Sequence, residues 1–130
     1  MTKINLGRQR MKRPRLIVVD DNRMYLSCLE DFFKHHGIEV HPVNGADEAL
    51  KVMQVRKFDL LLTDIQMPVM DGVELAKMVR GTWPEMPIIM HTANLTSQHY
   101  NLAEILGVSR VLDKSASPQE LVGVIRQICL

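Results

Sequence analysis

The 130-residue chain predicts an α/β fold in which a five-stranded parallel sheet carries helices on both faces. Two observations lead to this prediction. The hydrophobic pattern changes repeatedly from the period of a strand to the period of a helix, giving five strand–helix units in a row. In addition, residues 15–20 (RLIVVD) and 58–64 (FDLLLTD) are almost continuously apolar, as strands buried on both faces of a sheet require.

The first half of the chain holds three of the predicted strands. After the strand at 15–20, apolar residues recur at helical spacing up to Gly37, which suits the left-handed position at a helix end. This stripe consists of Tyr25, Cys28, Leu29, Phe32, Phe33 and His36. Residues 38–43 alternate and contain Pro42, which favours an edge strand. Asn44 is then predicted to cap a helix that precedes the strand at 58–64.

The second half repeats the alternation. A helix is predicted over VELAKMVRG (73–81), and two prolines bracket the entry to a strand at 88–92. Another helical stripe, closed by Gly107, precedes a weaker strand at 110–113. The members of this helical stripe are Leu95, His99, Leu102, Ala103 and Leu106. Ser117, Pro118 and Glu120 form a capping box with proline in the first turn, so the last helix is predicted to begin there.

Composition indicates one ordinary soluble domain, with 46% hydrophobic residues, 24% charged residues and a net charge of +1. No apolar run approaches the roughly 20 residues of a membrane helix, and no apolar segment of the secretory type follows the N-terminus. We therefore expect a cytoplasmic protein without membrane insertion. Cys28 and Cys129 are too few for a disulfide framework and are expected to be buried free thiols.

The charge is concentrated at the N-terminus. The first fifteen residues hold six basic side chains, and the rest of the chain has ten basic against fifteen acidic residues. We expect residues 1–14 to be a flexible basic tail and residues 15–130 to be the folded domain. Such a tail can bind nucleic acid or anionic lipid, but it has no aromatic residues for base stacking, so a solvated tail is the simpler interpretation.

Chemistry-bearing residues follow four of the five predicted strands. Asp20 and Asp21 follow the first strand, Asp64 ends the third, Thr92 ends the fourth and Lys114 follows the fifth. In open parallel sheets, ligands bind beyond the carboxyl ends of the strands. These residues are therefore expected to form one site.

Three converging carboxylates repel one another and favour a cation between them. Oxygen ligands without histidine or cysteine suit Mg²⁺, which keeps waters that a phosphate can replace. Lysine and threonine can bind phosphate oxygens, and a carboxylate can then attack phosphorus to form an aspartyl phosphate.

The stretches LIVVDDN and LLLTDIQMPVMDG, the pair Thr92–Ala93 and Lys114 resemble the response-regulator receiver domains of two-component signalling, including chemotaxis regulators. The resemblance covers residues 15–130 and implies a flavodoxin-like fold with strand order 2-1-3-4-5. It also implies a phosphoprotein of a phosphorelay, not an enzyme acting on a separate substrate.

The resemblance assigns a role to each residue of the site. Asp64 is similar to the phosphoacceptor, and Asp21 and Asp64 to the direct ligands of Mg²⁺. Asp20 is expected to act largely through water, and the backbone carbonyl of Gln66 to complete the protein ligands. Lys114 is similar to the lysine that pairs with the phosphoryl group.

Five positions concern switching. Thr92 is similar to the hydroxyl residue that follows the phosphoryl group, while Gln66 and Asn94 occupy positions that tune dephosphorylation. Two residues depart from the family pattern. Val111 stands where the family has an aromatic ring, and Ser115 stands where proline follows the lysine. The Lys114–Ser115 peptide can accordingly be trans, cis or mobile.

Simpler roles remain open for neighbouring residues. Asp71 is interpreted as the N-cap of the following helix, and His91 as a core or surface histidine rather than a ligand. Asp20 and Asp21 could cap the helix near residue 23, although capping needs one acid. Thr92 could have a purely structural role at the strand end.

The leading hypothesis is a switch that accepts a phosphoryl group from a histidine kinase or histidine phosphotransfer protein and then binds a downstream partner differently. An equal alternative is the receiver part of a longer regulator, whose output domain could bind DNA. A phosphatase of the haloacid dehalogenase type is disfavoured because its acids are separated as D-x-D, and a phosphate-independent scaffold is disfavoured because the full residue set is present.

Overall fold

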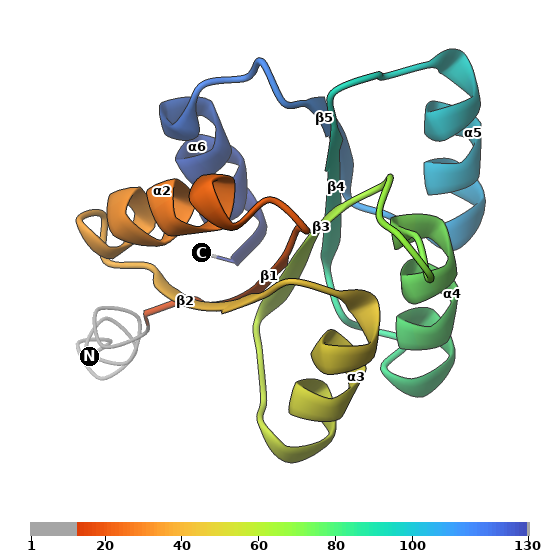
Figure 1. Ribbon diagram of the computed structural model, residues 1–130, viewed down its shortest axis with the longest axis horizontal. Helices are drawn as coiled ribbons and strands as arrows, with labels where there is room; N and C mark the ends of the chain where they lie inside the picture. Colours follow the sequence, from red (N-terminus) through yellow and green to blue (C-terminus); the bar gives the residue numbers. More distant parts are fainter. Residues whose placement is uncertain (1–12, 130) are drawn as a thin grey trace, which may run out of the picture.

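The computed structural model describes residues 13–129, and these form a three-layer α/β domain (Figure 1). Strands and helices alternate along the chain as predicted. The strands are β1 (Arg15–Val19), β2 (Glu39–Val43), β3 (Leu60–Asp64), β4 (Ile88–Thr92) and β5 (Arg110–Asp113). The helices are α2 (Arg23–Lys34), α3 (Ala46–Val55), α4 (Gly72–Thr82), α5 (Ser97–Leu106) and α6 (Pro118–Cys129).

The five strands are parallel and lie in the order β2-β1-β3-β4-β5. This confirms the predicted sheet and places β2, which contains Pro42, at an edge. Figure 1 shows α2 and α6 on one face of the sheet and α3, α4 and α5 on the other. The three central strands β1, β3 and β4 are buried almost throughout, which explains their continuous apolar sequences.

Each face of the sheet has its own core because side chains alternate along a strand. Leu16 and Val18 of β1 pack toward α2 and α6, whereas Ile17 and Val19 pack toward α3 and α4. The same alternation decides which residues at the strand ends lie on the α2 side of the sheet.

Helix ends follow the predicted capping residues with one exception. Gly37 and Gly107 have φ angles of 74° and 67°, as helix-ending glycines do. Ser117 Oγ accepts a hydrogen bond from Glu120 N at 3.2 Å, which confirms the start of α6. The N-cap of α3 is Gly45 rather than the predicted Asn44.

The buried stripe of α2 differs from the predicted one. Leu26, Leu29 and Phe33 are buried, whereas Tyr25 and Phe32 are only partly buried. Cys28 is exposed and Cys129 is partly exposed, so the expectation of buried thiols is wrong. The reason is that several residues of the predicted stripe lie on its flank, where helical spacing alone does not decide the burial.

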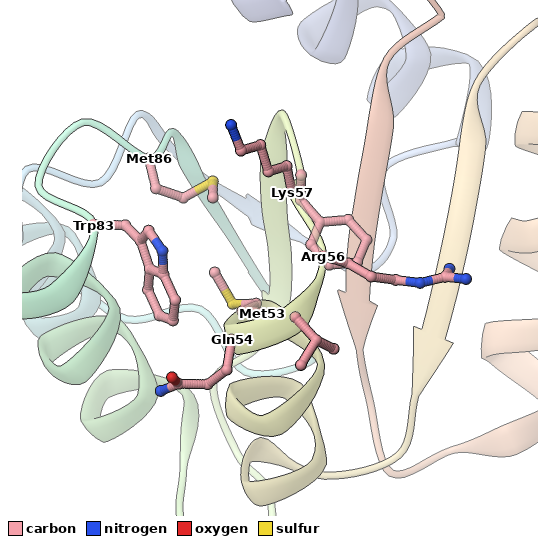
Figure 2. Close-up of a pocket in the computed structure, with 8 residues that line it drawn as sticks. Met53, Gln54, Arg56, Lys57, Trp83 and Met86 are labelled. Atoms are coloured by element: carbon pink, nitrogen blue, oxygen red, sulfur yellow. The ribbon is translucent and has the colours of Figure 1, made fainter.

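A groove of about 430 Å³ lies beside the N-terminal ends of the strands, between the end of α3 and the segment that joins α4 to β4 (Figure 2). Its walls include Met53, Trp83 and Met86. Because β3 and β4 begin beside it, this groove lies at the opposite edge of the sheet from the carboxyl ends of the strands.

Residues 1–12 of the predicted basic tail (residues 1–14) lie outside the described residues. Pro14 is buried, and its carbonyl accepts a hydrogen bond from Glu39 N at 2.9 Å. Within residues 13–129, none of the helices has the length and apolar character that crossing a membrane requires.

Candidate functional site

The predicted site residues lie together because the register of the parallel strands aligns the strand ends. Val19 is paired with Thr63, Asp64 with His91, and Thr92 with Asp113. The residues that directly follow β1 and β5 therefore lie at the same edge of the sheet as the last residues of β3 and β4.

Asp20, Asp21 and Asp64 form an acidic cluster at this edge. One carboxylate oxygen from each lies within 4.8 Å of the others, and this is a group within residues 13–129 that could hold a metal ion. Asp20 is fully buried and Asp64 is 5% exposed, whereas Asp21 is exposed to solvent. The arrangement offers oxygen ligands only, which fits a hard divalent cation.

Local backbone contacts orient the two buried carboxylates. Asp20 Oδ1 accepts a hydrogen bond from Asn22 N at 2.9 Å, and Asp64 Oδ1 accepts one from Gln66 N at 3.3 Å. Asn22, rather than either aspartate, caps α2 by accepting from Tyr25 N. The alternative in which Asp20 and Asp21 serve only as helix caps therefore has no support.

The ammonium group of Lys114 lies between the two buried carboxylates. Its Nζ is 2.7 Å from Asp20 Oδ2 and 3.2 Å from Asp64 Oδ2. Burial acts to lower the pKa of Lys114, but the hydrogen bond and charge of Asp20, with Asp64 in addition, raise it above its ordinary value of 10.5. Lys114 therefore stays protonated and supplies a permanent positive charge in the site.

The environment of Asp64, unlike that of Lys114, disfavours the ionised form of the side chain. Burial and then the charge of Asp20 raise its pKa above 3.8, and Lys114 offsets only part of this effect. The ionised form of Asp64 is therefore held at a cost in free energy, which any additional cation would reduce.

Thr92 and Asn94 connect the site to the segment after β4. Thr92 is fully buried, and its Oγ1 accepts a hydrogen bond from Asn94 N at 3.3 Å. Its backbone carbonyl accepts one from Lys114 N at 2.8 Å. The segments after β4 and β5 are thus linked directly. Asn94 and Gln66 are both exposed.

Val111 lies apart from the carboxylates. It is paired with Met90 across the sheet and is partly buried against the core on the α3–α5 face. No cis peptide bond occurs within residues 13–129, so the Lys114–Ser115 bond, which the sequence left open, is trans.

The loop between Asp64 and α4 has two constrained positions. Gly72 lies so close to β3 that an added Cβ would overlap the backbone carbonyl oxygen of Asp64. Val69 has a φ of 71°, a left-handed conformation that β-branched residues rarely adopt. Asp71 accepts a hydrogen bond from Glu74 N at 2.9 Å, as expected for the N-cap of α4.

Two residues contact the site without having been predicted to do so. Tyr25 extends from α2, and Lys114 Nζ lies 4.8 Å from the centre of its ring. His91 is 1% exposed, and its Nε2 lies 3.7 Å from Asp20 Oδ2. His91 is thus a core histidine, as interpreted, but one beside a carboxylate. Strand alternation carries the signal, since His91 follows Ile89 by two residues and so faces α2.

Known proteins are similar to this chain in sequence and in fold. Residues 16–126 match the model of the response regulator receiver domain. The alkaline phosphatase synthesis transcriptional regulatory protein PhoP of Bacillus subtilis (strain 168) is 30% identical over 114 residues, covering 88% of this chain and 48% of PhoP. The CAI-1 autoinducer sensor kinase/phosphatase CqsS of Vibrio cholerae is 30% identical over 122 residues, covering 92% of this chain and 18% of CqsS.

The structural similarity agrees with the sequence. A response regulator receiver domain protein (CheY-like) from Methanospirillum hungatei JF-1 superposes with a TM-score of 0.85 at 27% identity, over 89% of this chain and 93% of that one. The chain spans less than half the length of PhoP and CqsS. The family match and the shared architecture lead to one conclusion: the chain belongs to the response regulator receiver domain family, a family of signalling domains in two-component systems.

Proposed function

We propose that this domain is a phosphorylation switch that accepts a phosphoryl group on Asp64. The observation that carries the proposal is the position of Lys114 Nζ, which lies within 3.2 Å of Asp64 Oδ2 at the carboxyl edge of the sheet. A carboxylate beside a fixed ammonium group can attack phosphorus while the ammonium neutralises the charge on the transferring oxygens.

The donor is a phosphohistidine of a histidine kinase or a histidine phosphotransfer protein. An oxygen of Asp64 forms the new bond to phosphorus while the bond from phosphorus to the histidine nitrogen breaks. The imidazole leaves with that electron pair and takes a proton, and the product is an acyl phosphate on Asp64. The protein is therefore a phosphoacceptor that catalyses only its own phosphorylation and dephosphorylation.

Mg²⁺ is the cofactor that the acidic cluster fits. Asp21 and Asp64 would hold it directly, Asp20 largely through water, and the backbone carbonyl of Gln66 would complete the protein ligands. When bound, Mg²⁺ supplies positive charge for the phosphoryl oxygens. The raised pKa of Asp64 supports this assignment, because a cation would relieve the repulsion from Asp20.

The switch itself depends on Thr92 and Lys114. A phosphoryl group adds about −1.5 to −2 charges, and both side chains can move toward it, taking with them the segments after β4 and β5. Val111 has no ring to reorient, so the shift between the two states of the switch comes from the movement of these segments. Gln66 and Asn94 flank the path of the attacking water. Their amides can form hydrogen bonds but cannot act as general bases, so we expect moderate self-dephosphorylation.

The wider context is proposed from the relatives. PhoP is named as a transcriptional regulator and CqsS as a sensor kinase/phosphatase, so receiver sequences of this kind occur beside both output and kinase regions. We propose residues 15–130 as a cytoplasmic receiver domain with a basic tail at 1–14, acting alone or with an output domain. Nucleic acid would be contacted through such an output domain or, less favourably, through the tail. The length of the open reading frame distinguishes a stand-alone domain from part of a longer regulator.

The experiment is incubation with Mg²⁺ and a small acyl phosphate donor, followed by intact mass measurement. We expect one added phosphoryl group that hydroxylamine removes, as it removes acyl phosphates. Asp64→Asn should abolish the addition. Asp71→Asn is the matched control, because Asp71 caps α4 and should leave the labelling unchanged. Stable labelling of the Asp64→Asn protein would show that another residue is the acceptor.

A further inference from the structure

The partly buried Tyr25 and the buried His91 form a pair that belongs to no part of the proposed transfer reaction. His91 lies on the face of β4 that is covered by α2, and Tyr25 projects from the first turn of α2 toward it. The hydroxyl of Tyr25 is 3.2 Å from His91 Nδ1, and the two ring centres are 5.3 Å apart. Both polar groups thus meet in the interior, directly behind the acidic cluster.

The other ring nitrogen of His91 faces a carboxylate. His91 Nε2 lies 3.7 Å from Asp20 Oδ2, which is longer than a hydrogen bond, and Nε2 has no hydrogen-bond partner within residues 13–129. A buried polar nitrogen without a hydrogen-bond partner costs free energy, which indicates a role for His91 beyond packing.

The contacts of the ring select one of its two neutral forms. If Nδ1 carried the proton, the bare lone pair of Nε2 would face the carboxylate of Asp20 in the low-dielectric interior, which is unfavourable. If Nε2 carries the proton, the N–H points at Asp20 while Nδ1 accepts a hydrogen bond from the hydroxyl of Tyr25. Burial, and then the charge of Lys114, lower the pKa of His91 to about 3, so the ring is neutral. Burial raises the pKa of Tyr25 to about 12, which keeps its hydroxyl protonated.

The position of Lys114 accounts for the missing hydrogen-bond partner of His91 Nε2. Its ammonium group is 2.7 Å from the same Asp20 Oδ2 that His91 faces. In the proposed function, Lys114 is attracted to the phosphoryl group on Asp64. Asp20 Oδ2 would then lose its positive partner, although Asp20 remains fully buried.

We propose that Tyr25 and His91 are positioning residues. Tyr25 holds the His91 ring in its Nε2-protonated form, and His91 donates a hydrogen bond to Asp20 Oδ2 when Lys114 moves away from that oxygen. This inference rests on the proposed function, since phosphorylation is what removes Lys114. The donated hydrogen bond keeps the carboxylate of Asp20 in one orientation, and outer partners of this kind support metal ligands in general.

The first test is the protonation pattern of the His91 ring, read by nitrogen-15 NMR of the intact protein. We expect the neutral Nε2-protonated form before any donor is added, and a downfield shift of that proton after the acyl phosphate donor and Mg²⁺ are added. An Nδ1-protonated ring would overturn the proposal. So would an unchanged Nε2 proton in a sample that mass measurement shows to be phosphorylated.

The second test separates positioning from packing with three variants. His91→Leu removes the donor and fills the same space. In the presence of the acyl phosphate donor, which draws Lys114 away from Asp20, we expect its Mg²⁺ dissociation constant to rise roughly tenfold, as typically happens when a partner behind a metal ligand is lost, while its melting temperature does not fall. His91→Gln should recover most of the affinity, because its amide N–H can reach toward Asp20. Tyr25→Phe should yield a mixture of both neutral ring forms.

His35→Leu is the matched control, since His35 is exposed and caps the C-terminal end of α2, at the other end of the helix from Tyr25. Its Mg²⁺ affinity should equal that of the wild type. A His91→Leu protein that melts earlier but binds Mg²⁺ unchanged would show a packing role and overturn the proposal. Failure of the wild type to bind Mg²⁺ or accept a phosphoryl group would instead overturn the proposed function, and the ring pattern would still decide whether Tyr25 fixes His91.

Discussion

Arg80 is expected to stabilise the corner of the domain opposite the acidic cluster. Its guanidinium group donates to four backbone carbonyls: Nε to Leu106 at 3.0 Å, Nη1 to Pro84 at 2.7 Å and Met86 at 2.9 Å, and Nη2 to Gly107 at 3.1 Å. It thereby joins the end of α4 to the end of α5 and satisfies carbonyls that the end of α5 leaves unpaired.

The change Arg80→Ala should lower the free energy of unfolding by about 3 kcal/mol, because two of the four hydrogen bonds are part-buried and each bond from a charged donor is worth at least ~1.5 kcal/mol. The two exposed carbonyls can bind water instead and are not counted. For a domain of this size the melting temperature should fall by roughly 10 °C. Arg80→Lys should lose about half as much stability, since a point charge cannot reach all four oxygens.

Urea unfolding followed by the fluorescence of Trp83 measures this effect directly. Trp83 is the single tryptophan of the chain and lies in the groove that borders this corner (Figure 2). Lys77→Ala is the matched control, because Lys77 is exposed on the same helix and its loss should change stability by less than about 0.5 kcal/mol. An Arg80→Ala protein as stable as the control would refute this reasoning.

Four further outcomes are expected. The raised pKa of Asp64 means that the folded state binds its proton more tightly than the unfolded chain does, so the ionised carboxylate lowers stability above that pKa. Asp64→Asn should therefore raise the melting temperature at pH 7 without Mg²⁺, and the gain should vanish as the pH falls toward 3.8; an equal gain at all pH values would contradict this. Val69 is 98% exposed and left-handed, so Val69→Asn should stabilise the protein by about 1 kcal/mol in urea unfolding, and a loss of stability would argue against backbone strain. Asn94→Arg should slow self-dephosphorylation, measured by mass over time, because a bulky cation lies in the path of the water; unchanged decay would remove Asn94 from that path. On phosphorylation, amide signals of residues 92–96 and 110–117 should move in Val111→Ala but much less in Thr92→Ala, and the reverse result would make Val111 the switch.

The parallel sheet and the place of the site were predictable from short stretches of sequence, whereas the strand order was implied by the family resemblance. Continuous apolar runs required strands buried on both faces, and parallel strands bring their carboxyl ends to one edge. Asp20, Asp64, Thr92 and Lys114 were therefore expected together, and the structure places them together. The capping roles of Asp71 and Ser117 were also predictable, because a cap depends on residues within one turn.

Three-dimensional packing decided what local pattern could not. Burial of Leu26 rather than Cys28 depends on how α2 rotates against the sheet, which helical spacing does not determine. The bridging position of Lys114 and the contact of Tyr25 with His91 join residues that are 50 and 66 positions apart in the sequence. Such contacts arise only when the sheet register and the helix orientation are both set. The acidic edge thus follows from alternating apolar and helical segments, whereas the partners that hold its charges follow from the tertiary fold.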